Sequence, residues 1–324
     1  MQTRALGRTG LQIPELVVGA GAVGGLFVRG NEDEQRDALA AAAAAGMNWI
    51  DTAPLYGNGA SEATLGRLLP AGRDRPRLST KVMLDLTDPA ADLRSQVARS
   101  LERSLERLQA DKVTLLQLHN PIVSAAQGHA ITVRDVLRTG GALEALSRVR
   151  DAGLCDFIGL TALGEAPAII EAIDSGGFDT AQVYYNLLNA TAALAVPGGY
   201  RGARFDGVLD ACERHDLGTL AIRIFSAGVI ATDARHGREA PLTHGDTLAS
   251  ETAKAQEMFA AVDTGDDSRA QLALRFVLAQ PRLHAAIVGF EHLTYLEEAI
   301  AAQARGPLPA ETLQQIERVW QHAA

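Results

Sequence analysis

Eight short apolar segments alternate with stretches of helical periodicity, and this alternation constrains the fold more than any other feature of the sequence. Each segment has the length and composition of a strand buried in a parallel sheet. The segments lie at residues 16–18, 48–50, 77–80, 113–118, 157–160, 180–183, 219–222 and 285–288. Eight strands, each followed by a helix, predict an α/β fold of the (β/α)8 TIM barrel type.

The helices between these segments are read from their apolar spacing. The clearest covers residues 93–108, where leucines and a valine recur on one face and charged residues occupy the other. Further helices are predicted at 34–45, 61–69, 141–152, 165–175, 207–215, 267–279, 294–303 and 310–322. Residues 3–13 predict an N-terminal β-hairpin. No Pro- or Ser-rich linker breaks the alternation, so we expect residues 1–324 to form one barrel domain.

Three long connections interrupt the otherwise short spacing of the predicted elements. They cover about residues 120–140, 187–206 and 223–266. Connections of this length in a compact domain are usually functional. We expect these long loops at the C-terminal face of the barrel, where they would shape the site for a small-molecule substrate.

Charge and composition exclude several classes of protein. The chain has 30 basic and 39 acidic residues, a net charge of −9, and its basic residues are scattered, which argues against a nucleic-acid partner. No apolar stretch approaches the roughly 18 residues of a membrane span, and the N-terminus has no apolar signal region. Cys155 and Cys212 are isolated. We therefore expect a cytoplasmic protein without a membrane partner.

A glycine motif near the start suggests a different fold. Residues 19–24 read Gly-Ala-Gly-Ala-Val-Gly after an apolar strand, matching the G-x-G-x-x-G element of a Rossmann domain. That motif must open a helix directly, whereas this one continues into Gly25. We interpret the segment as a loop after the first barrel strand, where Gly19 and Ala20 let a ligand approach the backbone.

Four residues that can carry chemistry follow successive predicted strands. Asp51 ends the second strand, Lys81 the third and His119 the fourth, and Tyr56 stands five residues beyond Asp51. In a TIM barrel the carboxyl ends of the strands meet at one mouth, so these side chains should converge there. Each alone is commonly structural, but together they are complementary in charge and function.

Electrostatics assigns each of the four a role. A tyrosine has a pKa of about 10, and a nearby ammonium lowers it by stabilising the phenolate. We therefore expect Lys81 to make Tyr56 an acid–base group, with Asp51 keeping Lys81 charged. His119 can donate a hydrogen bond to a substrate oxygen and orient it. The set can protonate a carbonyl oxygen or deprotonate an alcohol, but a cofactor must supply the hydride.

The sequence resembles the aldo-keto reductases along essentially its whole length. The resemblance is carried by residues 6–11 (Leu-Gly-Arg-Thr-Gly-Leu), 51–57 (Asp-Thr-Ala-Pro-Leu-Tyr-Gly), 61–62 and 65–66 (Ser-Glu and Leu-Gly), 80–81, 116–119 and 182–188. Within that family, residues 51–57 are similar to the aldose 1-dehydrogenase and pyridoxal dehydrogenase branch. The resemblance implies a barrel that binds an extended nicotinamide dinucleotide, with Tyr56 as acid–base, Lys81 and Asp51 tuning it and His119 orienting the substrate.

The same resemblance implies the residues that bind the cofactor. Thr161 and Gln182 correspond to the partners of the nicotinamide carboxamide, although an alanine at 162 replaces the usual asparagine. Arg223 in the loop after the seventh strand is either a pyrophosphate ligand or a solvated arginine. The remaining positions that we assign to the cofactor are Tyr185, Ser226, Gly228, Gly289, Glu291, Tyr295 and Glu298.

Departures from the family pattern favour NAD(H) over NADP(H). Relatives bind the 2′-phosphate of NADP(H) with Lys or Arg, where this chain has Gly289, Glu291 and Tyr295. A carboxylate repels a phosphate but accepts a hydrogen bond from a ribose hydroxyl. No metal is expected, because Asp233, His236, His244 and Asp246 match no ligand spacing.

We therefore predict an NAD(P)-dependent oxidoreductase that interconverts an aldehyde or ketone, or a sugar hemiacetal and its lactone, with the corresponding alcohol. An alternative is a non-catalytic or slow cofactor-sensing regulatory subunit built on the same barrel. The four residues at the mouth do not discriminate between the two, because such subunits keep them. Turnover, or co-purification with a larger partner, would discriminate.

Overall fold

A closed barrel of parallel strands forms the centre of the protein, as the computed structural model shows for residues 1–324 except 88–91, 196–199, 201, 236, 238–246 and 323–324. The strands are hydrogen-bonded around the barrel in the order β10-β11-β12-β3-β4-β5-β6-β9. Their bounds are β3 (Leu16–Gly19), β4 (Trp49–Asp51), β5 (Arg77–Val82), β6 (Val113–Leu118), β9 (Cys155–Ala162), β10 (Thr180–Tyr184), β11 (Gly218–Ile222) and β12 (Ala285–Gly289). The prediction of a (β/α)8 barrel is confirmed.

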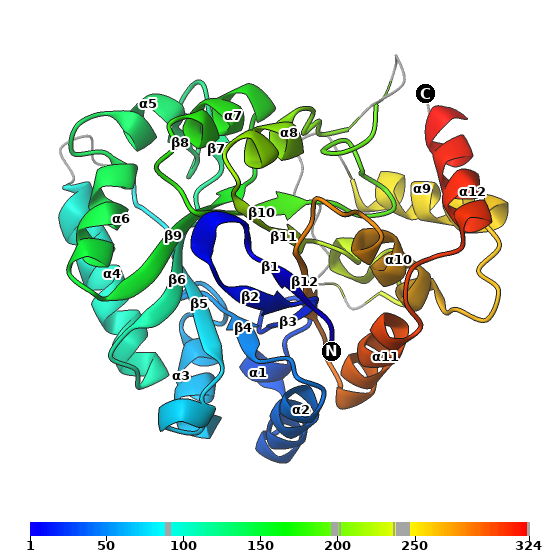
Figure 1. The fold of residues 1–324 in the computed structure, drawn as a ribbon, viewed down its shortest axis with the longest axis horizontal. Coiled ribbons are helices and arrows are strands. Elements are labelled where there is room, and N and C mark those ends of the chain that lie inside the picture. The colour runs from blue at the N-terminus through cyan, green and yellow to red at the C-terminus, as the bar shows by residue number, and fades with distance from the viewer. Residues whose placement is uncertain (88–91, 196–199, 201, 236, 238–246, 323–324) are drawn as a thin grey trace.

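Helices surround this barrel (Figure 1). They are α1 (Leu26–Arg29), α2 (Glu32–Ala44), α3 (Ala60–Leu68), α4 (Leu93–Leu108), α5 (Val133–Leu137), α6 (Ala142–Asp151), α7 (Ala166–Asp174), α8 (Val208–Arg214), α9 (Leu248–Ala261), α10 (Arg269–Leu278), α11 (Leu293–Ala304) and α12 (Ala310–His322). Every helix predicted from the apolar spacing is present. Helices α1, α5 and α9 were not predicted.

Helix α4 illustrates how local sequence sets these elements. The Asp92 side chain accepts hydrogen bonds from the backbone N–H groups of Arg94 and Ser95, and so caps the start of the helix. The helix ends where Gln109 adopts a left-handed conformation with φ of +51°. Between these ends, Val97 and Leu101 are buried against the barrel.

The expectation that residues 223–266 form one long loop is wrong over its second half, which contains α9. Thr247 and Ser250 cap this helix reciprocally, each side chain bonding to the other residue's backbone. The usual sequence signature has Glu or Gln where Ser250 stands, so the cap is not evident from sequence. The 120–140 segment also holds regular structure, a small parallel pair β7 (Ile122–Val123) and β8 (Ile131–Thr132).

The glycine motif does not build a Rossmann unit. Its last glycines form a turn, and Gly25, in a left-handed conformation, precedes only the four-residue helix α1. Gly24 approaches the backbone of Phe290 so closely that a Cβ there would lie 2.5 Å from the Phe290 nitrogen. The motif therefore serves the close packing of the loop after β3 against the loop after β12.

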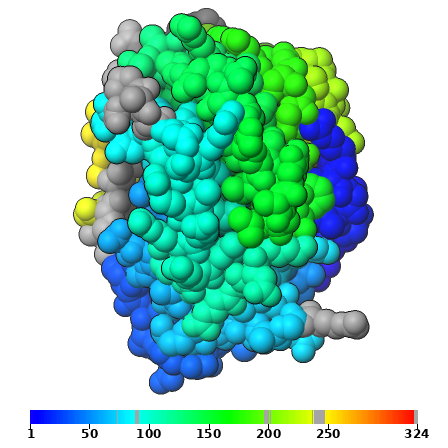
Figure 2. Space-filling model, turned by 90° about the vertical axis from the view of Figure 1, so that its left-hand side faces the viewer, coloured from blue at the N-terminus to red at the C-terminus, as the bar shows by residue number. Residues whose placement is uncertain are grey.

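An N-terminal hairpin closes one end of the barrel. Its strands, β1 (Thr3–Ala5) and β2 (Gln12–Pro14), are antiparallel, and Leu6 and Ile13 pack with Trp49, Leu115 and Leu220 inside the barrel. The dark blue hairpin lies across the barrel in Figure 1. In Figure 2 it is at one edge, while yellow residues around 250 lie at the opposite edge. Ligands must therefore enter at the C-terminal ends of the strands.

Two further sequence expectations concern the whole chain. Both cysteines are free and buried, in agreement with the absence of a disulfide pattern in the sequence. Among the residues that the structure describes, no helix combines the length and apolar character needed to span a bilayer.

Candidate active site

The four residues predicted to carry chemistry come together at the carboxyl ends of neighbouring strands. Asp51 is the last residue of β4, Lys81 lies near the end of β5, and His119 directly follows β6. The backbone N–H of His119 donates to the Val82 carbonyl at 2.8 Å, which holds it beside β5. Tyr56 follows in the turn between β4 and α3, and its ring meets the imidazole of His119 edge-on, with centroids 6.0 Å apart.

A buried ion pair connects three of these residues. Lys81 Nζ donates to Asp51 Oδ2 at 2.5 Å, to the Thr52 carbonyl at 2.9 Å and to the Tyr56 hydroxyl oxygen at 3.2 Å. The side chains of Lys81 and Asp51 are only 1% and 4% exposed. All three donors of the ammonium are therefore used, and one of them is aimed at the phenol.

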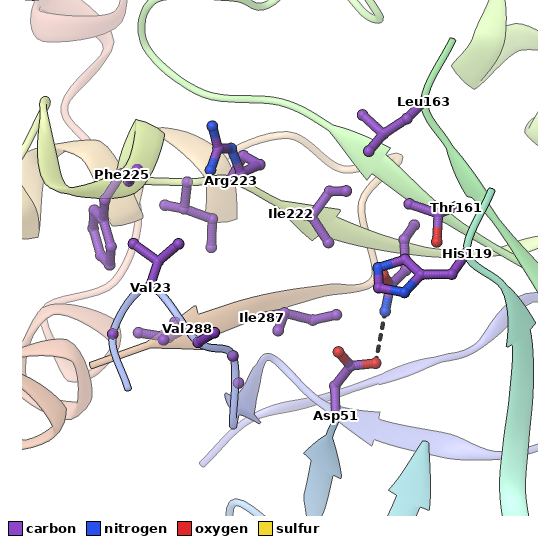
Figure 3. Close-up of a pocket in the computed structure, with 18 of the residues that line it drawn as sticks. Val23, Asp51, His119, Thr161, Leu163, Ile222, Arg223, Phe225, Ile287 and Val288 are labelled. Atoms are coloured by element: carbon purple, nitrogen blue, oxygen red, sulfur yellow. Dashed lines mark hydrogen bonds between the residues drawn. The ribbon is translucent and has the colours of Figure 1, made fainter. Parts of the chain in front are cut away.

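Two glutamine amides satisfy the second oxygen of the Asp51 carboxylate. Gln182 Nε2 donates to Asp51 Oδ1 at 2.7 Å, and Gln117 Nε2 donates to the same oxygen at 3.2 Å. The dashed line that begins at Asp51 in Figure 3 marks the bond from Gln182. Gln182 was predicted to bind the cofactor; it lines the cavity, but its amide nitrogen is bonded to Asp51.

Burial and neighbouring charges shift the pKa values of these groups. Burial raises the pKa of the Tyr56 phenol, and the Lys81 ammonium opposes this only in part, so the net lowering expected from the sequence is wrong for the free protein. Burial opposes the charged form of Lys81, but Asp51 and Tyr56 together outweigh it, so the pKa of Lys81 is raised and the ammonium stays charged. Burial, with the charges of Lys81 and His129, lowers the pKa of His119 to about 3. His119 is therefore neutral at physiological pH.

A second layer of hydrogen bonds fixes the strands that carry these residues. Ser61 Oγ donates to the Ala20 carbonyl at 2.8 Å and lies 2.8 Å from Thr52 Oγ1. Its neighbour Glu62, fully buried, accepts from Thr80 Oγ1 at 2.5 Å and pairs with Arg107 of α4. These contacts explain why Ser61 and Glu62 follow shortly after the motif at residues 51–57: they hold β3, β4, β5 and α4 together beneath the site.

One cavity of about 1370 Å³ opens above the ion pair. This exceeds the roughly 300–1,000 Å³ of an ordinary small-molecule pocket and leaves room for a long ligand beside a small one. Of the residues predicted for catalysis or cofactor binding, its wall includes Asp51, Tyr56, His119, Gly19, Thr161, Gln182, Arg223, Gly228, Gly289, Glu291, Tyr295 and Glu298. Lys81 lies beneath this wall and is bonded to Asp51 and Tyr56, which both line the cavity.

The chemistry of the wall fits a nicotinamide dinucleotide. Thr161 Oγ1 is buried at the cavity and makes no hydrogen bond within the described part of the chain, which leaves it for a polar ligand group such as a carboxamide. Arg223 brings a guanidinium to the same cavity, as Figure 3 shows. Thr161 and Gln182 would hold the nicotinamide, and Arg223 the phosphates.

Three residues predicted to bind the cofactor do not line the cavity. Ala20 is buried, and its N–H donates to the Asp51 carbonyl at 2.9 Å. The ring of Tyr185 stacks nearly parallel on Phe276 of α10, with centroids 5.3 Å apart, so it packs between barrel and helices. Ser226 donates to Glu251 at 2.7 Å. None of the three lines the cavity, and a direct contact of these residues with the cofactor stays a prediction.

Beyond β12 the cavity has a wall with an acidic character, here called the β12 side and defined by Ser268, Glu291, Tyr295 and Glu298. Ser268 caps α10 and also donates to Glu298 of α11. Ser268 and Gln271 also line the cavity, although neither was predicted to belong to the site. Their Ser-x-x-Gln spacing is a helix-capping signal that could have placed them at a helix start.

Most of the residues that were weighed as metal ligands lie outside the described part of the chain. Asp233 pairs with Arg269 at 2.9 Å. His236, His244 and Asp246 lie outside the described residues. Among the residues that are described, no group of three or more His, Cys, Asp or Glu is arranged to hold a metal ion.

Comparison with known proteins identifies relatives of this site and fold. A D-threo-aldose 1-dehydrogenase from Pseudomonas sp. is 32% identical over 253 residues, 70% of each chain. A pyridoxal 4-dehydrogenase from Microbacterium luteolum is 25% identical over 319 residues, 89% of each chain. These are the two kinds of enzyme that residues 51–57 resemble.

Solved structures match the fold over nearly the whole chain. An aldo-keto reductase from Bacillus halodurans in its holo form superimposes with a TM-score of 0.76 at 20% identity, covering 100% of this chain and 97% of that one. An aldo-keto reductase from Klebsiella pneumoniae in complex with NADPH gives a TM-score of 0.70 at 21% identity, covering 99% and 96%. The sequence model of the Aldo/keto reductase family matches residues 15–321. The chain therefore belongs to the aldo/keto reductase family.

Proposed function

We propose that this member of the family interconverts a carbonyl compound and its alcohol, with Tyr56 exchanging the proton. The observation that carries the proposal is the position of Lys81 Nζ, 2.5 Å from Asp51 and 3.2 Å from the Tyr56 hydroxyl at the floor of the cavity. A nicotinamide dinucleotide supplies or accepts the hydride when bound. In reduction the Tyr56 hydroxyl donates its proton to the carbonyl oxygen, and in oxidation the phenolate removes it from the alcohol.

The ion pair makes this proton transfer feasible near neutral pH. Burial alone disfavours the phenolate, as the raised pKa of Tyr56 shows, and Lys81 is the group that opposes this effect. As Tyr56 loses its proton, the bond from Lys81 becomes charge-assisted on both sides and strengthens. Asp51 has no direct part in the reaction; it keeps Lys81 protonated and in place.

His119 orients the substrate without moving a proton. Because its pKa lies near 3, the imidazole is neutral and can donate one hydrogen bond to the substrate oxygen. Its Nδ1 is buried with no hydrogen-bond partner among the described residues. A buried nitrogen without a hydrogen bond destabilises the fold. Its presence in the cavity wall therefore supports a functional reason for a histidine at this position.

The β12 side supports a preference for NAD(H) over NADP(H). Glu291 and Glu298 line it, and Glu298 accepts from Ser268. Two carboxylates repel the 2′-phosphate of NADP(H) electrostatically, whereas the 2′-hydroxyl of NAD(H) can donate to one of them. The Klebsiella structure contains NADPH, but its 21% identity does not carry that preference to this chain.

Substitution of Tyr56 by phenylalanine tests the proposal. We would follow reduced-nicotinamide absorbance with NAD(H) and NADP(H) against aldehydes, aldoses and pyridoxal, the last two because of the relatives' names. The variant should lose roughly 10²- to 10⁴-fold in kcat. Dinucleotide affinity, measured by calorimetry, should stay within about twofold. Turnover that survives Tyr56→Phe would contradict the assignment.

A further inference from the structure

The loop that follows β11 has an unusual backbone. The loop consists of residues 223–228 and is here called the β11 loop. Three of its non-glycine residues have left-handed conformations: Arg223 with φ of +61°, Ser226 with φ of +44° and Ala227 with φ of +57°. Each such residue costs of order 1 kcal/mol or more and persists only where surrounding contacts hold it. The loop lines the cavity through Arg223, Phe225, Ala227 and Gly228. Its shape therefore matters to the ligand, and something must maintain it.

The contacts that hold the β11 loop come from behind the cavity wall. Ser226 Oγ donates to Glu251 Oε2 of α9 at 2.7 Å, and both residues are buried, with Glu251 only 4% exposed. Neither is among the described residues that line the cavity. At the start of the loop, Asn186 Nδ2 donates to the Arg223 carbonyl at 2.8 Å. The strained backbone is thus held at Arg223 and at Ser226 by side chains that do not line the cavity.

Charge links Glu251 to the guanidinium in the cavity. Burial lowers the pKa of Arg223, while Tyr184 and Glu251 oppose that change and stabilise its charged form. Glu251 also adds to the effect of burial in raising the pKa of Tyr184. The Tyr184 ring is in turn fixed by stacking on Phe205, with centroids 5.3 Å apart. A buried carboxylate is costly unless it is compensated, and here the compensation comes from the β11 loop itself.

We propose that Glu251 is a positioning residue for dinucleotide binding, which holds the β11 loop in its strained form so that Arg223 and the loop backbone face the phosphates. The inference rests on the proposed function, since it concerns the same cavity and the same cofactor. It also assigns a role to Ser226: this residue acts through Glu251 rather than by contact with the cofactor.

Calorimetric titration of NADH and NADPH into the whole protein tests this proposal. Glu251→Gln keeps the size of the side chain but removes the charge that compensates Arg223. We expect Kd for the preferred dinucleotide to weaken roughly tenfold, because each 1.4 kcal/mol is tenfold. The kcat at saturating dinucleotide should stay within about twofold of wild type, because the reacting groups are unchanged.

Ser226→Ala is a milder variant that removes the hydrogen bond to Glu251 from the loop side and leaves the carboxylate charge in place. Its effect on Kd should be in the same direction. Glu251→Ala removes the same hydrogen bond from the helix side, so the double variant Ser226→Ala, Glu251→Ala should bind no more weakly than Glu251→Ala alone. Additive losses in the double variant would contradict the pairing on which the proposal depends.

Glu15→Gln is the matched control. Glu15 is also a buried carboxylate, 7% exposed, which pairs with Arg4 at 2.7 Å and accepts from Gln303. It lies just before β3, at the closed end of the barrel. Both substitutions should lower the free energy of unfolding, but only Glu251→Gln should weaken Kd. Equal Kd values for all variants would reduce Glu251 to a purely structural residue. A wild-type protein that binds neither dinucleotide would instead overturn the proposed function.

Discussion

The cavity has two regions in which charge is held very differently. On the reacting side, formed by Asp51, Tyr56, Lys81 and His119, opposite charges are buried together, with Lys81 and Asp51 only 1% and 4% exposed. The β12 side carries carboxylates close to solvent, and its Tyr295 is 51% exposed. A buried charge depends on its partner for the stability of the fold, whereas a solvated charge does not. Changes on the reacting side should therefore affect folding and chemistry together, and changes on the β12 side only affinity.

The largest effect should follow from Lys81→Met, which removes the cation and leaves the Asp51 carboxylate buried. Breaking a buried ion pair in this way costs about 3–5 kcal/mol. The two glutamine bonds to Asp51 Oδ1 remain, but Oδ2 loses the donor 2.5 Å away. Urea denaturation should show the loss of stability, and turnover should fall by at least the factor expected for Tyr56→Phe.

The double variant Lys81→Met, Asp51→Asn separates the two effects. An asparagine is neutral and can still accept from Gln182, so most of the lost stability should return. Turnover should not return, because the phenol still lacks its ammonium. If activity recovers with stability, Lys81 contributes only to folding and the proposed proton chemistry is wrong.

An intermediate effect should follow from Glu298→Lys on the β12 side. The new ammonium would face a region that now carries carboxylates, so the ratio of NADPH to NADH affinity should rise roughly tenfold. The kcat and the free energy of unfolding should change little, because Glu298 is partly exposed and its one hydrogen-bond partner among the described residues is Ser268. Kd values for both dinucleotides, measured by calorimetry, check this expectation.

Glu297→Lys is the control for that change. Glu297 precedes Glu298 on α11, is exposed, and is not among the described residues of the cavity wall. The same change in net charge at that position should leave the ratio of affinities within about twofold, since the charge of an exposed side chain that does not line the cavity is solvated and screened. Equal shifts in both variants would mean that overall charge, not the β12 side, sets the preference.

The sequence predicted the strand ends of the reacting side better than the rest of the cavity. Asp51, Lys81 and His119 end strands whose apolar runs are plain in the sequence, and strands of one barrel must open at one mouth. Their convergence could therefore be predicted. The burial that raises the pKa of Tyr56 could not, because it depends on tertiary packing around the phenol and not on a local sequence pattern.

Beyond the strand ends, side-chain direction is not set by a simple period. Tyr185 and Ser226 stand in segments that line the cavity, yet Tyr185 turns toward Phe276 and Ser226 toward Glu251. Ser226 also has a positive φ, a conformation that the sequence does not reveal in a non-glycine residue. Glu251 itself was unforeseen because its helix, α9, begins with a cap that lacks the usual glutamate.

The smallest effect concerns the protonation of His119. Its pKa is about 3 in the folded protein, mainly because of burial, and about 6.5 in an unfolded chain. Between these values the unfolded state binds more protons, so stability is complete above pH 6.5 and declines as the pH falls toward 3. The decrease from pH 7 to 5.5 should reach about 1 kcal/mol. Urea denaturation across this range measures it.

His119→Gln is the variant that isolates this contribution, because glutamine does not titrate. Its free energy of unfolding should depend less on pH between 7 and 5.5 than that of the wild type, by the same amount of about 1 kcal/mol. The proposed role of His119 as a neutral donor further requires that its titration not appear in kcat/KM in this range. An acidic limb near pH 6.5 that disappears in His119→Gln would mean that the imidazole is solvated and charged, and that the reacting side is less protected from water than its ion pair implies.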